Sequence, residues 1–170
     1  TTGLLKEKNT FLLSQGYGAL TMNDSNSISN YYGLNFSKNL NNYGNIYFSS
    51  MMGFSELNNL NNSFIVDTSD VLTSNFEINY ELENLIDNDK LDISLSQPNR
   101  VEKGDMTFRL TGLADSNGNL PYHDHNIDLV PTGRQIDLSI GYYTKHSKNL
   151  KTGVKTILTD DLGHIRGNNL

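Results

Sequence analysis

The segment Asn75-Phe76-Glu77-Ile78-Asn79-Tyr80-Glu81-Leu82 alternates polar and apolar side chains without a break. Successive side chains of a β-strand point to opposite faces of the sheet, so this period of two predicts a strand with one apolar and one polar face. The same alternation is clear at 91–96, 106–111 and 135–142. It is weaker at 10–20, 31–37, 45–54, 63–67, 126–130 and 151–158.

Together these segments predict an all-β chain with about ten strands at the even spacing of a sandwich or barrel. Clusters of Asn, Asp, Ser and Gly separate them, and such residues tolerate the backbone angles of tight turns. The one helical signal, from Leu4 to Lys8, is too short to form an independent helix. Because strand follows strand without helical crossovers, we expect an antiparallel meander.

Composition limits the classes of function. The 170 residues suffice for one domain, so we treat 1–170 as a single β-domain. The absence of Cys excludes disulfides and thiolate metal sites, and a net charge of −6 argues against a nucleic-acid partner. No apolar run reaches the ~18 residues of a membrane-spanning helix, although barrel strands, which expose only alternate residues to lipid, are not excluded.

The two ends of the sequence suggest a fragment. The chain opens with Thr1-Thr2-Gly3, without an initiator Met or an export signal, and closes with Asn168-Asn169-Leu170 in a turn-like sequence. We therefore expect a β-domain cut at both ends, whose final strand lies beyond Leu170.

The first hairpin has a specific predicted register. If 91–96 pairs with 106–111, Leu91 faces Leu110, Ile93 faces Phe108 and Leu95 faces Met106. Asp92 then faces Arg109 on the polar side. A one-residue slip would set every apolar side chain opposite a polar one, although two-residue shifts keep the same parity.

Candidate chemical sites are few. His123 and His125 could both bind a metal from one strand face, but no third ligand is placed, which favours a solvated turn. The segment Asp115-Ser116-Asn117-Gly118-Asn119 has the start of a calcium loop without its closing bidentate acid, so a plain turn is favoured. Asp160, Asp161 and His164 lack a Ser nucleophile in a recognisable elbow. We expect no catalytic residues, metal or cofactor in this segment.

Three motifs carry a family resemblance. They are Asp70–Phe76 followed by Asp89–Gly104, then Ile127–Leu138, and last Asp161–Ile165. In order and spacing they resemble the C-terminal region of exported bacterial subtilisin-family serine peptidases. The resemblance is strongest over 65–166. The sequence departs from the family pattern at Asn99 in place of Leu, Lys103 in place of a small residue, and Leu162 in place of Pro.

The resemblance implies an autotransporter-like β-domain that follows a peptidase domain. It implies a non-catalytic, outer-membrane-type β-barrel region that anchors or exports an upstream subtilisin-like serine endopeptidase. The implied partners are the lipid bilayer and that peptidase domain, and the implied location is the outer membrane or cell surface, otherwise secreted or periplasmic. The matching residues are Ser96, Gln97, Pro98, Arg100, Val101, Glu102, Gly104, Pro131, Gly133, Arg134, Gln135, Asp137 and Leu138.

The chemistry of these residues indicates architecture. Pro98 cannot donate to a β-ladder and is expected to end the strand begun at Leu91. Gly104 and Gly133 suit tight bends. The guanidinium groups of Arg100 and Arg134, near strand ends, could clamp turn carbonyls or a carboxylate.

Alternation alone leaves two readings open. In a membrane barrel the apolar face meets lipid, while Glu77, Glu81 and Asp137 point into a wet lumen, and the Tyr-rich segment 31–54 could supply an interfacial girdle. In a soluble β-sandwich, acting as an adhesion or accessory module, the apolar face forms a dry core. An independent enzyme is a third and weaker reading.

Overall fold

The computed structural model describes residues 1–170 except 11–24, 42–43, 59–63, 87 and 170. Ten antiparallel strands form two sheets, which confirms the all-β antiparallel prediction. The predicted strand at 10–20 lies almost wholly outside the described residues. A 3-10 helix, η3 (Leu162–His164), follows the last strand.

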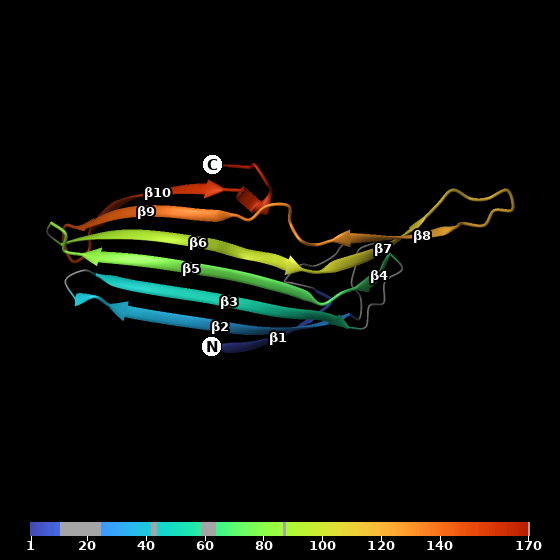
Figure 1. The fold of residues 1–170 in the computed structure, drawn as a ribbon, viewed down its shortest axis with the longest axis horizontal. Coiled ribbons are helices and arrows are strands. Elements are labelled where there is room, and N and C mark those ends of the chain that lie inside the picture. Colours follow the sequence, from blue (N-terminus) through green and yellow to red (C-terminus); the bar gives the residue numbers. More distant parts are fainter. Residues whose placement is uncertain (11–24, 42–43, 59–63, 87, 170) are drawn as a thin grey trace.

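The larger sheet has seven strands in the order β1-β2-β3-β5-β6-β9-β10 (Figure 1). Their bounds are β1 Thr2–Lys8, β2 Asn26–Asn39, β3 Asn45–Asn58, β5 Val71–Glu83, β6 Asp89–Lys103, β9 Ile136–Lys145 and β10 Lys151–Asp160. Among the described residues β1 pairs only with β2 and β10 only with β9, so this sheet is open at both edges.

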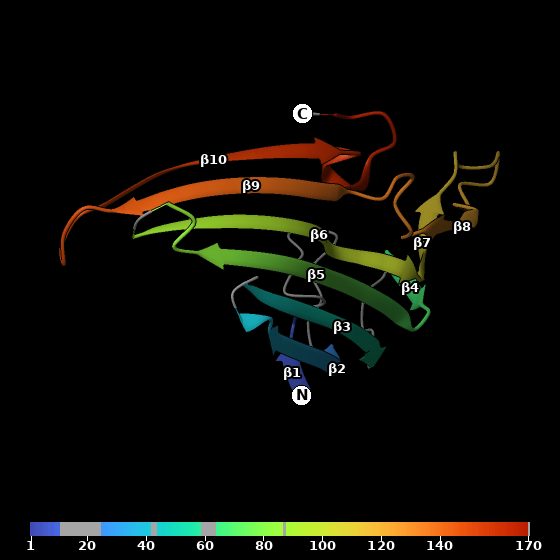
Figure 2. The same cartoon turned by 60° about the vertical axis from the view of Figure 1, so that its left-hand side comes forward.

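The smaller sheet has the order β4-β7-β8, with β4 Ile65–Thr68, β7 Asp105–Thr111 and β8 Tyr122–Asp128. It continues beyond one end of the larger sheet, and the β7–β8 hairpin projects furthest (Figures 1 and 2). A small apolar core lies here. Ile65, Val71 and Met106 are its buried members, packed against Leu57, Phe64, Val101, Phe108 and Leu129.

The predicted first hairpin is wrong. Strand β6 pairs with β5 and β9, so that Leu91 faces Leu82 on one side and Tyr142 on the other. Strand β7 leaves the large sheet and pairs with β4 and β8. Arg109 therefore forms its cross-strand ion pair with Asp124, at 2.7 Å, and Asp92 is not its partner.

Two local predictions also fail. The segment from Leu4 to Lys8 lies in strand β1, because its backbone pairs with β2. Pro98 does not end its strand, which continues to Lys103. The β5–β6 register shifts between the Ser74–Arg100 and Phe76–Gln97 pairs, and the β6–β9 pairing stops at Ser96. Pro98 thus lies at a bulge on the β5 side, at a point where β9 no longer pairs with β6 on the other side. Its missing N–H therefore removes no hydrogen bond from the β-ladder.

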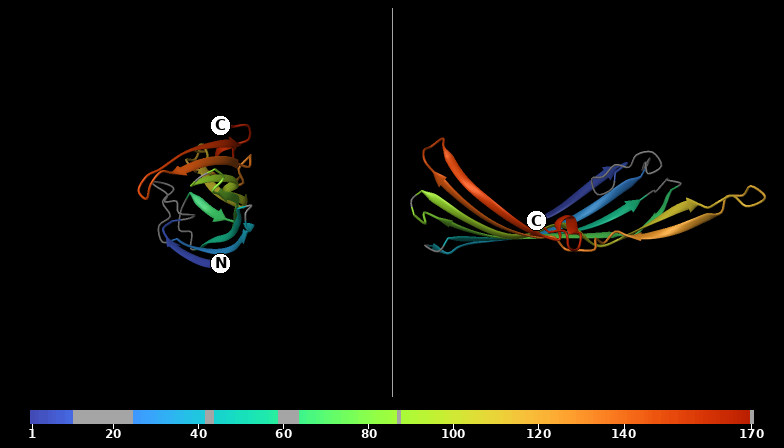
Figure 3. Two further views of the ribbon diagram at one scale, coloured as in Figure 1. Left: turned by 90° about the vertical axis from the view of Figure 1, so that its left-hand side faces the viewer. Right: turned by 90° about the horizontal axis from the view of Figure 1, so that it is seen from above.

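The large sheet is strongly curved (Figure 3). Glycines on one face allow aromatic rings to lie against the backbone of neighbouring strands. Gly53 lies directly opposite Tyr31, and a Cβ on Gly53 would be 2.9 Å from the Tyr31 ring. Tyr143 covers Gly141 in the same way, at 2.8 Å, and also covers Gly153 across the β9–β10 pair. Glycines and aromatic partners of this kind let a strand bend sharply.

Candidate functional site

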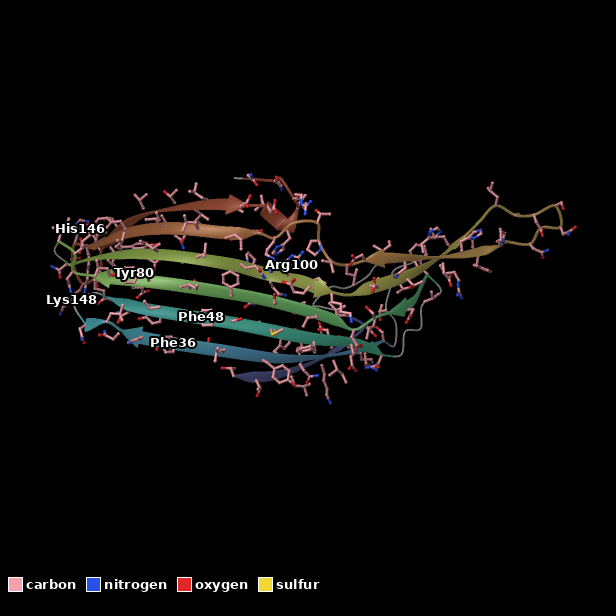
Figure 4. The ribbon with its side chains drawn as sticks, in the orientation of Figure 1. Phe36, Phe48, Tyr80, Arg100, His146 and Lys148 are labelled. Carbon is pink, nitrogen blue, oxygen red and sulfur yellow. The ribbon has the colours of Figure 1, made fainter. Side chains whose placement is uncertain are left out.

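The convex face of the large sheet is apolar and exposed to solvent. The strand registers place Phe36, Phe48 and Ile78 in one row across β2, β3 and β5. Figure 4 looks onto this face, where Phe36, Phe48 and Tyr80 are labelled. The row continues through β6, β9 and β10 with Leu95, Leu138 and Leu158. Phe36 is 54% and Leu158 59% exposed, so no other part of the described chain covers this band.

The concave face is polar, and many of its side chains are buried. Ser29 and Ser55 lie opposite one another, 2.7 Å apart, and both are 1% exposed. Ser94 and Ser139 form an equivalent pair at 2.6 Å. The carboxylates expected to share one face do so. Glu77, Glu81 and Asp137 all lie on the concave side.

This polarity is the reverse of that of a water-soluble sheet, which buries its apolar face against a second layer. Among the described residues only three hydrophobic side chains are buried, and all three belong to the small core beside β4 and β7. The apolar band is therefore available to an apolar environment outside this chain.

The three family-like motifs meet at the end of the large sheet that adjoins β7. Arg100, whose side chain is only 10% exposed, donates from Nε to the Gly133 carbonyl at 2.9 Å and from Nη2 to the Pro131 carbonyl at 2.9 Å. Its Nη1 donates to Glu102 at 2.6 Å. One guanidinium thus fixes the segment that leads into β9 against the end of β6.

Arg134 and Glu102 form the second connection. Two guanidinium nitrogens of Arg134 donate to the two Glu102 oxygens at 2.9 and 2.7 Å, and Arg134 also donates to Gln97. Burial acts to raise the pKa of Glu102. Hydrogen bonds from Arg134 and Ser74, together with the charges of Arg134 and Arg100, outweigh it and hold the pKa below its ordinary value.

The third motif contacts the other two motifs through His164 and Gly163. The His164 ring accepts from the Gln135 N–H at 2.9 Å and contacts the Asn99 carbonyl at 3.1 Å. The Gly163 N–H donates to the Gln135 side chain at 2.8 Å. A Cβ on Gly133 would lie 2.6 Å from the Asp161 carboxylate, so the turn packs directly on a glycine.

Asp161 organises this turn. Its Oδ1 accepts from the Gly167 N–H at 2.6 Å and its Oδ2 from the Arg134 N–H at 3.1 Å. These backbone hydrogen bonds lower the pKa of the Asp161 carboxyl, and burial opposes them only in part. Asp161 and His164 both adopt positive φ angles. In this conformation the carboxylate and the ring accept from the backbone N–H groups of Arg134 and Gln135, just before β9.

The other motif residues have separate positions. Ser96 pairs with Asp137 between β6 and β9, and Asp137 accepts hydrogen bonds from Gln135 and Thr159. Val101 packs against the small core, and Gly104 lies against Val71, where a Cβ would be 2.9 Å from Cγ2. The motif set is therefore a structural joint rather than one reactive centre.

Two of the weaker candidate sites lie on the β7–β8 hairpin. His123 and His125 lie on strand β8, rather than in a turn, and both are exposed. The oxygens of Asp115 accept from Asn117 and Asn119, which makes 115–119 a self-contained turn. No group of three or more His, Asp or Glu side chains among the described residues could hold a metal ion.

No family model matches the chain, and neither a curated protein nor a solved structure is significantly similar to it. Within the described ranges, no helix is long and apolar enough to cross a membrane. The two faces of the large sheet and the structural joint are the features of this chain that indicate a function.

Proposed function

We propose that the large sheet is part of the wall of an outer-membrane-type β-barrel, which anchors or helps to export an upstream subtilisin-like serine endopeptidase. The segment itself is non-catalytic. The observation that carries the membrane part of this proposal is the reversed polarity of the sheet, with an exposed apolar convex face and a polar concave face. Transmembrane barrels present an apolar band to lipid and a polar interior to water.

Strand length supports the proposal. A tilted strand needs ~9–11 residues to cross the hydrocarbon region. Strands β2, β3, β5 and β6 contain 14, 14, 13 and 15 residues, and β9 and β10 contain 10 each. Each of these six strands is therefore long enough to cross.

The connections support it as well. At one end of the large sheet the strands are joined by residues 40–44, 84–88 and 146–150, five residues each. At the other end the connections are residues 9–25, 59–70 and 104–135, and the last two include the small sheet. Outer-membrane barrels have this asymmetry, with short turns on the periplasmic side and longer loops outside. On this proposal the β7–β8 hairpin faces the exterior.

The link to a peptidase rests on the resemblance of the three motifs alone. Arg100, Arg134, Glu102 and Asp161 hold those motifs together through contacts among themselves. Such a joint fits a region that has to stay folded while it carries another domain.

Membrane insertion can be tested with single cysteines, because the chain has none of its own. Asn117→Cys places a thiol at the hairpin tip and Ser147→Cys places one in a short turn. In intact cells that export the protein, a membrane-impermeant maleimide should label the hairpin thiol and spare the turn thiol until the outer membrane is opened. Equal labelling of both, with release of the protein into the soluble fraction, would refute insertion and favour a soluble β-sandwich module.

A further inference from the structure

Three adjoining hollows follow the concave face, with volumes of about 340, 400 and 300 Å³. Ser49 lines all three, and Asn35, Asn75 and Glu77 each line two. The other residues of this face that line the hollows are mainly Asn, Ser, Tyr and Gly. No Lys or Arg side chain of the described ranges lines any of the three. Because they share lining residues and carry the carboxylates of Glu77 and Glu81, the hollows form one trough with a negative bias.

The carboxylates beside this trough are incompletely neutralised. The Glu77 carboxylate makes no hydrogen bond or ion pair with any described residue. In the next acidic row Glu81 lies directly opposite Asp92, and like charges in this position repel each other. Lys90 pairs with Glu81 at 2.6 Å and also feels the charge of Asp92, which accepts a hydrogen bond from the Asn79 amide at 3.0 Å.

A buried oxygen adds to this bias. The Oδ1 atom of Asn79 is buried and has no hydrogen-bond partner within the part of the chain that the structure describes. A buried acceptor without a donor keeps its full negative partial charge, which adds to that of the neighbouring carboxylates. It lies in the row between Glu77 and Glu81.

No lysine of the described strands lies in the row of Glu77, which runs through Ser96, Asp137 and Thr159. Lys145 lies opposite Lys151 near the short turns, whereas Lys155 lies in the row of Asp92 and Glu81. All three are exposed. The level of Glu77 therefore carries the carboxylates of Glu77 and Asp137 without a lysine, which gives this part of the trough a negative field.

We propose that the concave face lines a water-filled passage across the membrane that favours small cations over anions, with Glu77 setting the preference. Carboxylates that line a pore are a general means of selecting cations. This inference rests on the proposed membrane insertion.

The test is conductance of the full chain in planar lipid bilayers under a KCl gradient. The reversal potential should show K⁺ passing more readily than Cl⁻, and Glu77→Gln should lower the K⁺/Cl⁻ permeability ratio by at least about twofold. Glu77→Asp should retain the preference. The matched control is Glu56→Gln, which makes the same change on the convex face and should leave the ratio unchanged.

Protease protection in vesicles separates the two proposals. A chain that fails to insert contradicts the proposed function. A chain that inserts but conducts no ions, or that favours Cl⁻, overturns the passage and leaves the barrel wall standing. A ratio that is unchanged in Glu77→Gln overturns the role of Glu77.

Discussion

Leu138→Arg distinguishes a lipid-facing sheet from a water-facing one. Leu138 lies in the middle of the convex band, between Leu95 on β6 and Leu158 on β10, and is 38% exposed. At a bilayer midplane an arginine on this face costs about 2–4 kcal/mol, roughly a 30- to 800-fold loss in the folding equilibrium. In water the leucine is already partly exposed, so the same change should stay within about 0.5 kcal/mol.

The matched control is Leu113→Arg, on the β7–β8 hairpin, where the side chain is 93% exposed and lies outside the band. Unfolding by urea in lipid vesicles, followed by circular dichroism because the chain has no Trp, should show a loss of stability for Leu138→Arg alone. If both variants match the unsubstituted chain in vesicles to within about 0.5 kcal/mol, the convex face does not meet lipid and the argument is refuted.

Three further predictions concern the structural joint. Arg100→Ala should destabilise the fold by about 3 kcal/mol, because it removes one ion pair of Glu102 and leaves the carbonyls of Val101, Pro131 and Gly133 without the Arg100 donor. Chemical denaturation measures this loss, and Arg100→Lys should restore only part of it. Because the pKa of Asp161 is lowered, the stabilisation from its carboxylate is complete above the ordinary pKa and is lost as the pH falls through the lower folded value. The protection factor of the Gly167 amide against hydrogen exchange should therefore fall over that acid range. In Asp161→Asn this protection should already be low at neutral pH. Gly133→Ala should displace the Asp161 turn and lower the thermal midpoint of unfolding. Gly3→Ala is the control, because a Cβ there meets nothing closer than 3.9 Å and should leave the midpoint unchanged. Equal midpoints for the two variants would contradict this prediction.

The period of two was sufficient to predict most strands of the large sheet and the shared face of Glu77, Glu81 and Asp137, because side-chain alternation is a local property of a strand. It could not predict that β6 pairs with β9 in place of β7, since any apolar strand of the right parity satisfies the same rule. Leu4 to Lys8 was misassigned for a related reason, because pairing with β2 overrides a weak helical signal.

The joint was only partly predictable. The motif residues were identified, and the chemistry of Arg100 indicated a clamp on turn carbonyls. The pairing of His164 with Gln135 and Asn99 spans up to 65 residues of sequence, and no local pattern encodes such a contact. The exposed state of the apolar face was likewise beyond prediction, because alternation is the same whether lipid, water or a second sheet lies outside.

The pairing of Tyr143 with Gly141 and Gly153 has a consequence for how this sheet can evolve. A larger residue at either glycine collides with the ring, while loss of the ring leaves bare backbone at the bend. Each change alone is harmful, so the three positions should be inherited as one unit. Among descendants of this sequence we expect them to be replaced together, with compensating changes in both strands, or not at all.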